Sequence, residues 1–129
     1  MPFEWQEFLG LAERLLEVDS EAAYRTAISR AYYSVFNVAR ERAERNNCRF
    51  DPDTHGGMHK KCWDLYRKGP DPGCTQLGID GGRLSEVRTR ADYKSGEYVR
   101  LKEEATQFID KIKAFRQKLT ALDARYPKP

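Results

Sequence analysis

The sequence predicts an all-α fold, an up-and-down bundle of four to five helices. Three observations indicate this fold. Residues 101–122 repeat apolar side chains at alternating steps of four and three residues, a seam that suits helix packing in a bundle. Residues 21–45 carry many alanines, which favour a helix and allow its neighbours to approach closely. No stretch shows the period of two that is typical of a half-buried strand.

The length and composition indicate one globular domain. The chain has 129 residues, enough for one core but not for two, so we expect a single domain over residues 1–129. Hydrophobic residues make up 40% of the chain and charged residues 33%, which argues against general disorder. The net charge of +3 is mild for a nucleic-acid-binding module.

The sequence also gives expectations about the cellular compartment. The longest uncharged stretch, residues 31–39, is far shorter than the roughly 20 apolar residues of a membrane span, so we expect no membrane partner. The acidic start, MPFEWQEF, does not resemble a signal peptide. The three cysteines, Cys48, Cys62 and Cys74, are odd in number and scattered, which argues against a disulfide framework. We therefore expect a cytoplasmic protein.

The first two helices are expected over residues 4–18 and 21–45. Ser20 is a good N-cap for the second helix, and Asn46-Asn47 ends it. Each helix has one apolar stripe that should face the core. The stripes consist of Trp5, Phe8, Leu11, Ala12, Leu15 and Leu16 in the first helix and of Ile28, Ala31, Val35 and Val38 in the second.

The second half of the chain is predicted to contain three more helices. Thr54 can cap a third, shorter helix that extends to about Lys68. We expect a surface loop from Gly69 to Gly82, because this stretch is rich in glycine and proline. A fourth helix of about three turns should follow. The last helix should begin near Ser95 or Gly96 and end near residue 125.

A first group of candidate site residues lies on the second helix. Arg30, Tyr33 and Asn37 follow one another at steps of three and four residues and therefore share one face of the helix. That face borders the apolar stripe, so these polar side chains should be partly buried and should need partners. Two interpretations stay open: Arg30 pairs with a carboxylate from another helix, or this face contacts a ligand.

A second group is the stretch from Arg88 to Tyr93. Arg88 and Asp92 are four residues apart and can pair with each other, which would leave Arg30 for a ligand. Arg88, Arg90 and Tyr93, at a helix end beside a glycine-rich loop, can instead form a phosphate site. Our prediction is that Arg30 pairs with Asp92 and locks the two helices in register, because a buried charge needs a partner.

A third candidate is the pattern His55-Gly-Gly-Met-His59, followed by Cys62. Histidines four residues apart on a helix can chelate zinc. Here two glycines weaken the helix, and no carboxylate lies between the histidines. We therefore expect no metal and no cofactor, with Cys62 in the core and one histidine capping a helix or lining a groove.

Three motifs, in order, resemble the HEPN-domain family. The first is Ser29-Arg30-Ala31-Tyr32-Tyr33 followed by Phe36, which is similar to the signature helix of that family. The second is Thr54-His55-Gly56-Gly57-Met58, which resembles the start of its third helix. The third is Arg88 with Ala91-Asp92-Tyr93, which resembles its Arg-x-x-Ala-Asp-Tyr ending. The resemblance covers about residues 20–125.

The resemblance implies a HEPN-like helical bundle that usually forms a homodimer. Many HEPN proteins are ribonucleases, often toxins, and many are encoded beside a minimal nucleotidyltransferase partner. In the nuclease members, an arginine followed after four to six residues by a histidine forms the active motif. Here the corresponding positions after Arg88 hold Tyr93, Lys94 and Ser95, so the motif lacks its histidine.

We therefore expect a regulatory protein that binds a nucleotide or RNA without cleaving it, as the partner of a minimal nucleotidyltransferase in a toxin–antitoxin-type pair. The residues expected to bind are Arg30, Tyr33, Asn37, His55, Arg88, Arg90 and Tyr93. Two alternatives stay open, so the sequence does not decide whether the protein is an enzyme. One is a metal-independent ribonuclease toxin with Arg88, Arg90 or Tyr93 as catalytic candidates, and the other is a purely structural dimer.

Overall fold

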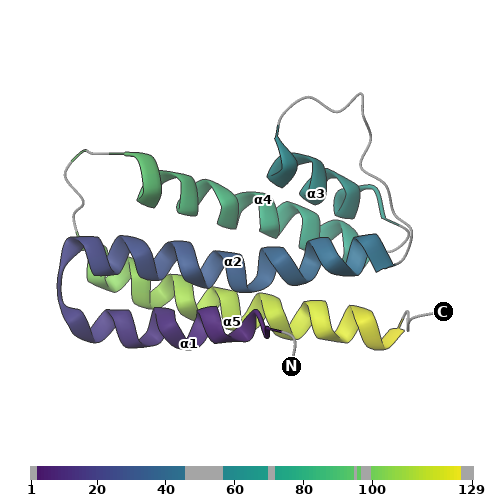
Figure 1. Cartoon of the computed structure of the whole chain (residues 1–129). Helices are drawn as coiled ribbons and strands as arrows, with labels where there is room; N and C mark the ends of the chain where they lie inside the picture. Colours follow the sequence, from purple (N-terminus) through teal and green to yellow (C-terminus); the bar gives the residue numbers. More distant parts are fainter. Residues whose placement is uncertain (1–2, 46–56, 70–71, 95, 97–99, 126–129) are drawn as a thin grey trace.

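The computed structural model describes residues 3–45, 57–69, 72–94, 96 and 100–125. Within these ranges the chain forms five α-helices and a short 3-10 helix, and it forms no strand, so the predicted all-α class is confirmed (Figure 1). The helices are α1 (Gln6–Leu15), followed by the 3-10 turn Leu16–Val18, then α2 (Glu21–Arg45), α3 (Met58–Arg67), α4 (Pro72–Tyr93) and α5 (Leu101–Arg125).

Helix α2 is the central element of the bundle, because it contacts each of the other helices. In Figure 1, α2 and α5 run from left to right, whereas α1 and α4 run from right to left. The short helix α3 packs on α4 near the C-terminal end of α2. This arrangement brings α2, α3 and α4 side by side.

The sequence explains why α2 takes the central position. Its bounds agree with the predicted helix, and Ser20 caps it as expected, since Ser20 Oγ accepts a hydrogen bond from the Ala23 backbone N–H at 3.1 Å. Ala27, Ala31 and Ala39 are fully buried, and their small side chains let neighbouring helices approach. A helix that is contacted on several sides needs such small residues on more than one face.

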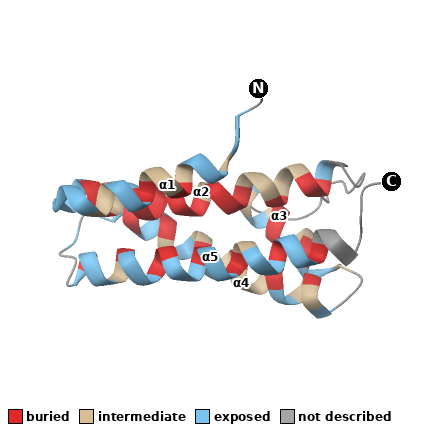
Figure 2. Cartoon of the chain, turned by 90° about the horizontal axis from the view of Figure 1, so that it is seen from below, coloured by how far each residue is buried: buried red, intermediate tan, exposed pale blue. Residues whose placement is uncertain are grey.

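The core lies where the helices face one another, and Figure 2 shows buried residues on those inner sides. The seam predicted for the last helix is buried throughout α5, at Leu101, Ala105, Phe108, Ile112, Phe115, Leu119 and Leu122. Cys62 is also fully buried, as the sequence predicted. Burial raises the pKa of its thiol to about 12, so this cysteine stays protonated and packs as an apolar residue.

The prediction of a surface loop from Gly69 to Gly82 is wrong for most of this stretch. Pro72 begins α4, which continues without a break to Tyr93. Proline is well tolerated at the first helical position. Two of the glycines serve the packing of α3: a Cβ at Gly78 would lie 2.6 Å from the Trp63 carbonyl oxygen, and a Cβ at Gly81 would collide with the Trp63 indole. These glycines are therefore helix-contact residues and do not form a loop.

Two helix ends also differ from the prediction. The segment 4–18 divides into α1 and the 3-10 turn, and Asp19 then adopts a left-handed φ of 58°. The last helix begins at Leu101 and not near residue 95, because Arg100 also has a left-handed φ of 58° and cannot continue a right-handed helix. In the described part of the chain, no helix combines the length and the apolar character that crossing a membrane requires.

Candidate functional site

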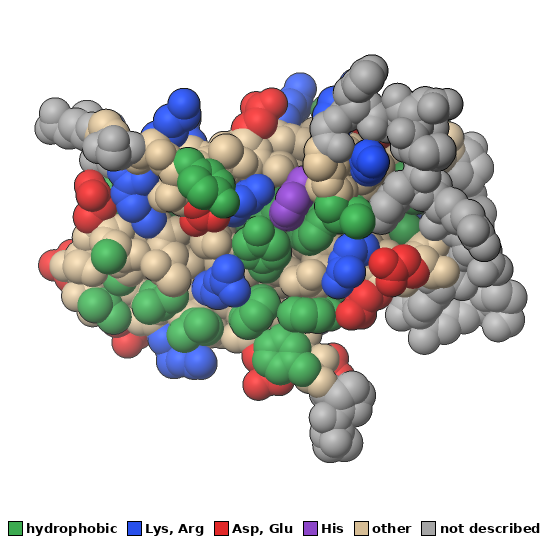
Figure 3. Space-filling model, turned by 45° about the horizontal axis from the view of Figure 1, so that its top comes forward, with side chains coloured by type: hydrophobic (Ala, Val, Ile, Leu, Met, Phe, Trp, Pro, Cys, Tyr) green, Lys and Arg blue, Asp and Glu red, His purple; other side chains and the backbone are tan. Residues whose placement is uncertain are grey.

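Aromatic side chains of α2 meet a histidine of α3 and an arginine of α4. We name Tyr32, Tyr33, Phe36, His59 and Arg88 the His59 cluster. The His59 ring stacks on Phe36 with 4.1 Å between ring centroids, and it lies 5.7 Å from the Tyr33 ring. Figure 3 shows a histidine at the surface among hydrophobic and basic side chains, and His59 is the histidine that the structure describes.

Tyr32 engages one of the two ring nitrogens of His59. The Trp63 Nε1–H donates to the Tyr32 hydroxyl oxygen at 3.0 Å, and Ser85 also donates to that oxygen. The Tyr32 hydroxyl is also hydrogen-bonded to His59 Nδ1 at 2.7 Å, and the donor in this contact depends on the tautomer of the ring. In the tautomer in which Nδ1 accepts from Tyr32, the neutral imidazole carries its proton on Nε2.

The surroundings keep His59 neutral. Burial lowers the pKa of His59 from 6.5, and the positive charge of Arg88 lowers it further. Burial also raises the pKa of Tyr32 to about 12, so Tyr32 does not ionise near neutral pH. Nε2 of His59 has no partner in the described part of the chain and is not sealed from solvent. When Nδ1 accepts from Tyr32, this neutral histidine presents an Nε2–H donor to a ligand.

Arg88 contributes a second donor group. Its side chain is 9% exposed, and its guanidinium carbon lies 5.5 Å from the centre of the Tyr32 ring and 5.6 Å from that of Tyr33. Nη1 forms an ion pair with Asp92 Oδ2 at 3.4 Å, whereas the buried Nε has no hydrogen-bond partner among the described residues. A buried guanidinium with an unpaired N–H is costly, and such groups often receive an acceptor from a ligand.

The predicted ion pair between Arg30 and Asp92 is wrong. Asp92 Oδ2 pairs with Arg88 and accepts a hydrogen bond from Ser29 Oγ at 3.4 Å. The Arg30 guanidinium instead lies over the rings of Phe8 and Tyr33, at 4.9 and 5.0 Å, and donates to Ser29 Oγ at 3.4 Å. Arg30 turns toward α1 because these two rings provide a cation–π site. The rival pair, Arg88 with Asp92, is the one that forms.

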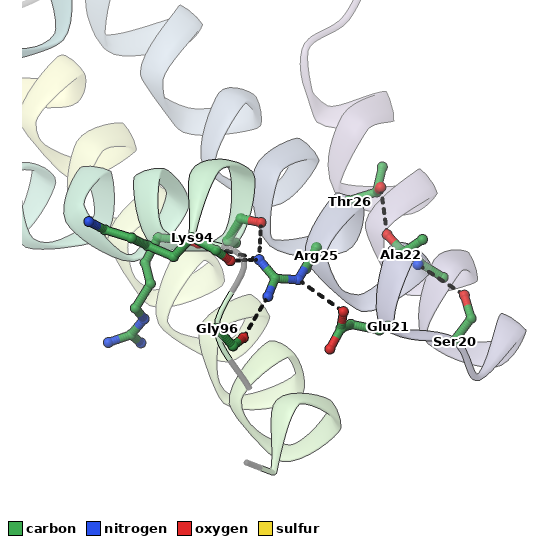
Figure 4. A network of polar contacts seen from close by, with 10 residues as sticks. Ser20, Glu21, Ala22, Arg25, Thr26, Lys94 and Gly96 are labelled. Carbon is green, nitrogen blue, oxygen red and sulfur yellow. Dashed lines mark hydrogen bonds and ion pairs between the residues drawn. The ribbon is translucent and has the colours of Figure 1, made fainter. Parts of the chain in front are cut away.

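Arg25 performs the locking role that the sequence assigned to Arg30. Its Nη1 donates to the carbonyl oxygens of Ala91 at 2.9 Å and Lys94 at 2.6 Å (Figure 4). Its Nη2 reaches the Gly96 carbonyl at 3.4 Å, and its Nε pairs with Glu21 at 3.6 Å. The Ala91 carbonyl lies in the last turn of α4, and those of Lys94 and Gly96 directly follow the helix, where its dipole favours a cation. Arg25 therefore holds the end of α4, including Asp92, against α2.

The other predicted site residues lie outside the cluster. Asn37 bonds within α2: its Nδ2 donates to the Tyr33 carbonyl at 3.0 Å, and its Oδ1 accepts from Arg40. Arg90 forms an ion pair with Glu104 of α5. Tyr93 is 74% exposed at the end of α4, and His55 lies outside the described residues. Of the predicted binding residues, the structure brings together Arg30, Tyr33 and Arg88.

His59 is the site residue that sequence analysis missed as a binding residue. A signal was present, because His59 precedes Cys62 and Trp63 by three and four residues and so extends the apolar stripe of α3. A polar ring at the end of a buried stripe is expected to be half-buried. The expectation that one histidine lines a groove or caps a helix came closest to this position.

The described part of the chain has two grooves. One, of about 420 Å³ between α3 and α4, is lined by Trp63 and Ser85 together with charged side chains such as Lys60 and Arg67. The other, of about 320 Å³, lies between α4 and α5. Neither groove is lined by Arg30, Tyr33, Asn37, Arg88, Arg90 or Tyr93, so the candidate site is the His59 cluster.

Comparison with known proteins adds no family assignment. The chain matches no protein-family model, no curated protein and no solved structure. The geometry of the His59 cluster is therefore the basis for a function.

Proposed function

We propose that this protein is a HEPN-like RNA- or nucleotide-binding protein that holds a phosphate-bearing ligand at the His59 cluster and does not cleave it. The observation that carries the proposal is the meeting of two unused donors, Nε2 of a neutral His59 and the underused guanidinium of Arg88, beside the Tyr33 ring. Arginine and imidazole N–H groups suit phosphate oxygens, and an aromatic face can stack on a base.

The protonation of His59 supports binding over catalysis. A ribonuclease needs a base that removes the 2′-hydroxyl proton and an acid that protonates the leaving oxygen. In the cluster, Nδ1 is occupied by Tyr32 and Nε2 already carries a proton, so His59 cannot accept one at neutral pH without breaking that contact. The same group donates a hydrogen bond well.

A metal-independent ribonuclease is the second candidate. The observation that favours it is that His59 and Arg88 both pack on the Tyr32 ring, each at 5.5 Å from its centre, although the two residues are 29 positions apart in sequence. An arginine beside a histidine can stabilise the charge of a phosphorane. The resemblance to HEPN domains supports both candidates, and it is the basis for proposing a homodimer and a nucleotidyltransferase partner.

The test is to measure binding and cleavage on the same samples. A fluorescein-labelled single-stranded oligoribonucleotide is titrated with the protein in EDTA, and the RNA is then analysed on a denaturing gel. We expect saturable binding and intact RNA. His59→Phe keeps the ring but removes the donor, and Arg88→Met keeps the length but removes the charge. Each should weaken binding by about tenfold or more, as for the loss of a hydrogen bond to a charged group.

Arg83→Ala is the matched control, because Arg83 lies on α4 with a side chain that is 76% exposed. Its affinity should equal that of the wild type. RNA cleavage in EDTA that disappears in His59→Phe would establish the ribonuclease candidate instead. Binding that is equal in all variants would remove the His59 cluster from consideration.

A further inference from the structure

Among the residues that the structure describes, no carboxylate balances the charge of Arg30 directly. Its guanidinium is held by the rings of Phe8 and Tyr33, and its one hydrogen bond is a long one, 3.4 Å, to Ser29 Oγ. It forms no ion pair among the described residues, and its remaining nitrogen atoms are not sealed from solvent. A guanidinium presents five N–H donors, so most of the hydrogen-bonding capacity of Arg30 is open to a ligand.

Arg30 and Arg88 lie over the same ring. Their guanidinium carbons are 5.0 and 5.6 Å from the centre of Tyr33. A polar chain also connects them, because Arg30 donates to Ser29, Ser29 donates to Asp92, and Asp92 pairs with Arg88. Asp92 balances the charge of Arg88 by direct contact and that of Arg30 only through a hydroxyl. The two guanidiniums are thus fixed relative to each other, and one net positive charge lies at Arg30.

We propose that the site binds two neighbouring phosphate groups, one at Arg88 and His59 and the other at Arg30, on either side of the contact with Tyr33. This inference rests on the proposed phosphate-binding function and specifies its ligand. Planar guanidinium groups recognise phosphate oxygens in a bidentate manner, and a second one adds affinity for a ligand that has a second phosphate in reach. The shared chemistry is a pair of neighbouring phosphate groups. The pair can be the diphosphate of a free nucleotide or two successive phosphates of an RNA strand.

The experiment compares ligands that differ by one phosphate. Dissociation constants are measured by isothermal titration calorimetry for AMP, for ADP and for the 5′-phosphorylated dinucleotide pApA. We expect ADP or pApA to bind the wild type at least about tenfold more tightly than AMP, as for one added charged hydrogen-bond pair. A gain with ADP alone identifies a diphosphate ligand, and a gain with pApA alone identifies an RNA strand; each supports the inference.

The Arg30→Gln variant assigns the gain to its residue. In this variant the ratio of the AMP and ADP (or pApA) dissociation constants should fall to about one. Arg30→Lys keeps the charge without the planar fork, so its ratio should lie between the two. Arg83→Gln, on the exposed side of α4, should keep the wild-type ratio.

Two negative outcomes have different meanings. If AMP binds and neither two-phosphate ligand binds more tightly, or if the gain persists in both Arg30 variants, the two-phosphate inference is overturned while the proposed function stands. If neither these ligands nor the single-stranded oligoribonucleotide binds, the proposed function itself is wrong.

Discussion

At the scale of single residues, His59 shows how a neighbour that never touches a ligand can set the chemistry of a site. Tyr32 accepts a hydrogen bond from Trp63 Nε1–H and is hydrogen-bonded to His59 Nδ1. When Tyr32 is the donor in that contact, Nε2 carries the proton and is the donor that faces a ligand. Phe36, stacked at 4.1 Å, keeps the ring in place. Position, tautomer and charge of His59 all follow from residues of α2 and their partners.

The lowered pKa of His59 makes a prediction about stability and pH. An unfolded chain takes up a proton at this histidine near pH 6.5, whereas the folded chain does so only at lower pH. Between those values the unfolded state binds more protons, so the free energy of unfolding should fall as the pH drops from 7.5 to 5.5. His59→Phe lacks this group and should lose less stability over that range. Urea unfolding of both proteins at each pH checks this, and parallel curves for the two would contradict it.

At the scale of elements, Arg25 connects α2 to the end of α4. Removing it should leave the carbonyls of Ala91 and Lys94 without their charged donor. We expect Arg25→Ala to lower the free energy of unfolding by about 1.5–3 kcal/mol. Arg25→Lys keeps a cation at the helix C-terminus but not the fork, so it should restore only about 0.3–1 kcal/mol of this.

The control for Arg25 is its neighbour. Thr26→Ala removes a hydroxyl that bonds only to the Ala22 carbonyl in its own helix, as Figure 4 shows. It should change the free energy of unfolding by no more than about 0.5 kcal/mol. An equal loss in Arg25→Ala and Thr26→Ala would mean that Arg25 does not join the two helices.

Adjacent glycines of α4 should respond in opposite directions to the same substitution. A Cβ at Gly81 would collide with the Trp63 indole, so Gly81→Ala should destabilise the protein by about 1–3 kcal/mol. A Cβ at Gly82 would meet nothing within 4 Å, so Gly82→Ala should stabilise it by about 0.5–1 kcal/mol through helix propensity. Urea unfolding of the two variants measures both. Two changes of the same sign would disprove this account of the packing between α3 and α4.

These glycines also show where sequence analysis succeeds and where it fails. Periodic apolar positions predicted α2 with its observed bounds and the buried face of α5, because the same spacing that forms a helix buries its stripe. The N-terminal half of α4 was missed, because composition alone does not distinguish a glycine that serves a turn from one, such as Gly81, that admits a neighbouring ring.

The site was predictable only in part for a similar reason. Tyr33 and Arg30 could be grouped because they share one helix, and Arg88 because its motif is recognisable. His59 joins them from another helix, through contacts that depend on how α3 packs. Asp92 pairs with Arg88 and not with Arg30, because the guanidinium of Arg30 lies over the rings of Phe8 and Tyr33.

At the scale of the whole molecule, the resemblance to HEPN domains predicts a homodimer. Large hydrophobic side chains that stay exposed in the described part of one chain include Phe3 at 51% and Tyr93 at 74%. Aromatic residues are enriched at protein interfaces. We expect multi-angle light scattering at micromolar concentration to give twice the 15.0 kDa of one chain. A mass of 15.0 kDa throughout a concentration series would contradict the dimer.

The charge of the whole molecule predicts a shallow salt dependence of ligand binding. The chain has 23 basic and 20 acidic side chains, so its net charge of +3 produces only a weak long-range field for a polyanion. Affinity should then come from the few phosphates that the His59 cluster and Arg30 contact. Each phosphate contact on a single strand contributes a slope of about −0.7 to a plot of log affinity against log salt, so two contacts give about −1.4.

Fluorescence anisotropy with the single-stranded oligoribonucleotide between 50 and 300 mM KCl, roughly the range in which such slopes are linear, measures this slope. A slope near −5, roughly seven contacts, would mean that the RNA lies along a broad basic surface. In that case the Arg30→Gln variant would lower the slope by only a small fraction, whereas two-phosphate binding at the cluster requires it to fall by about half.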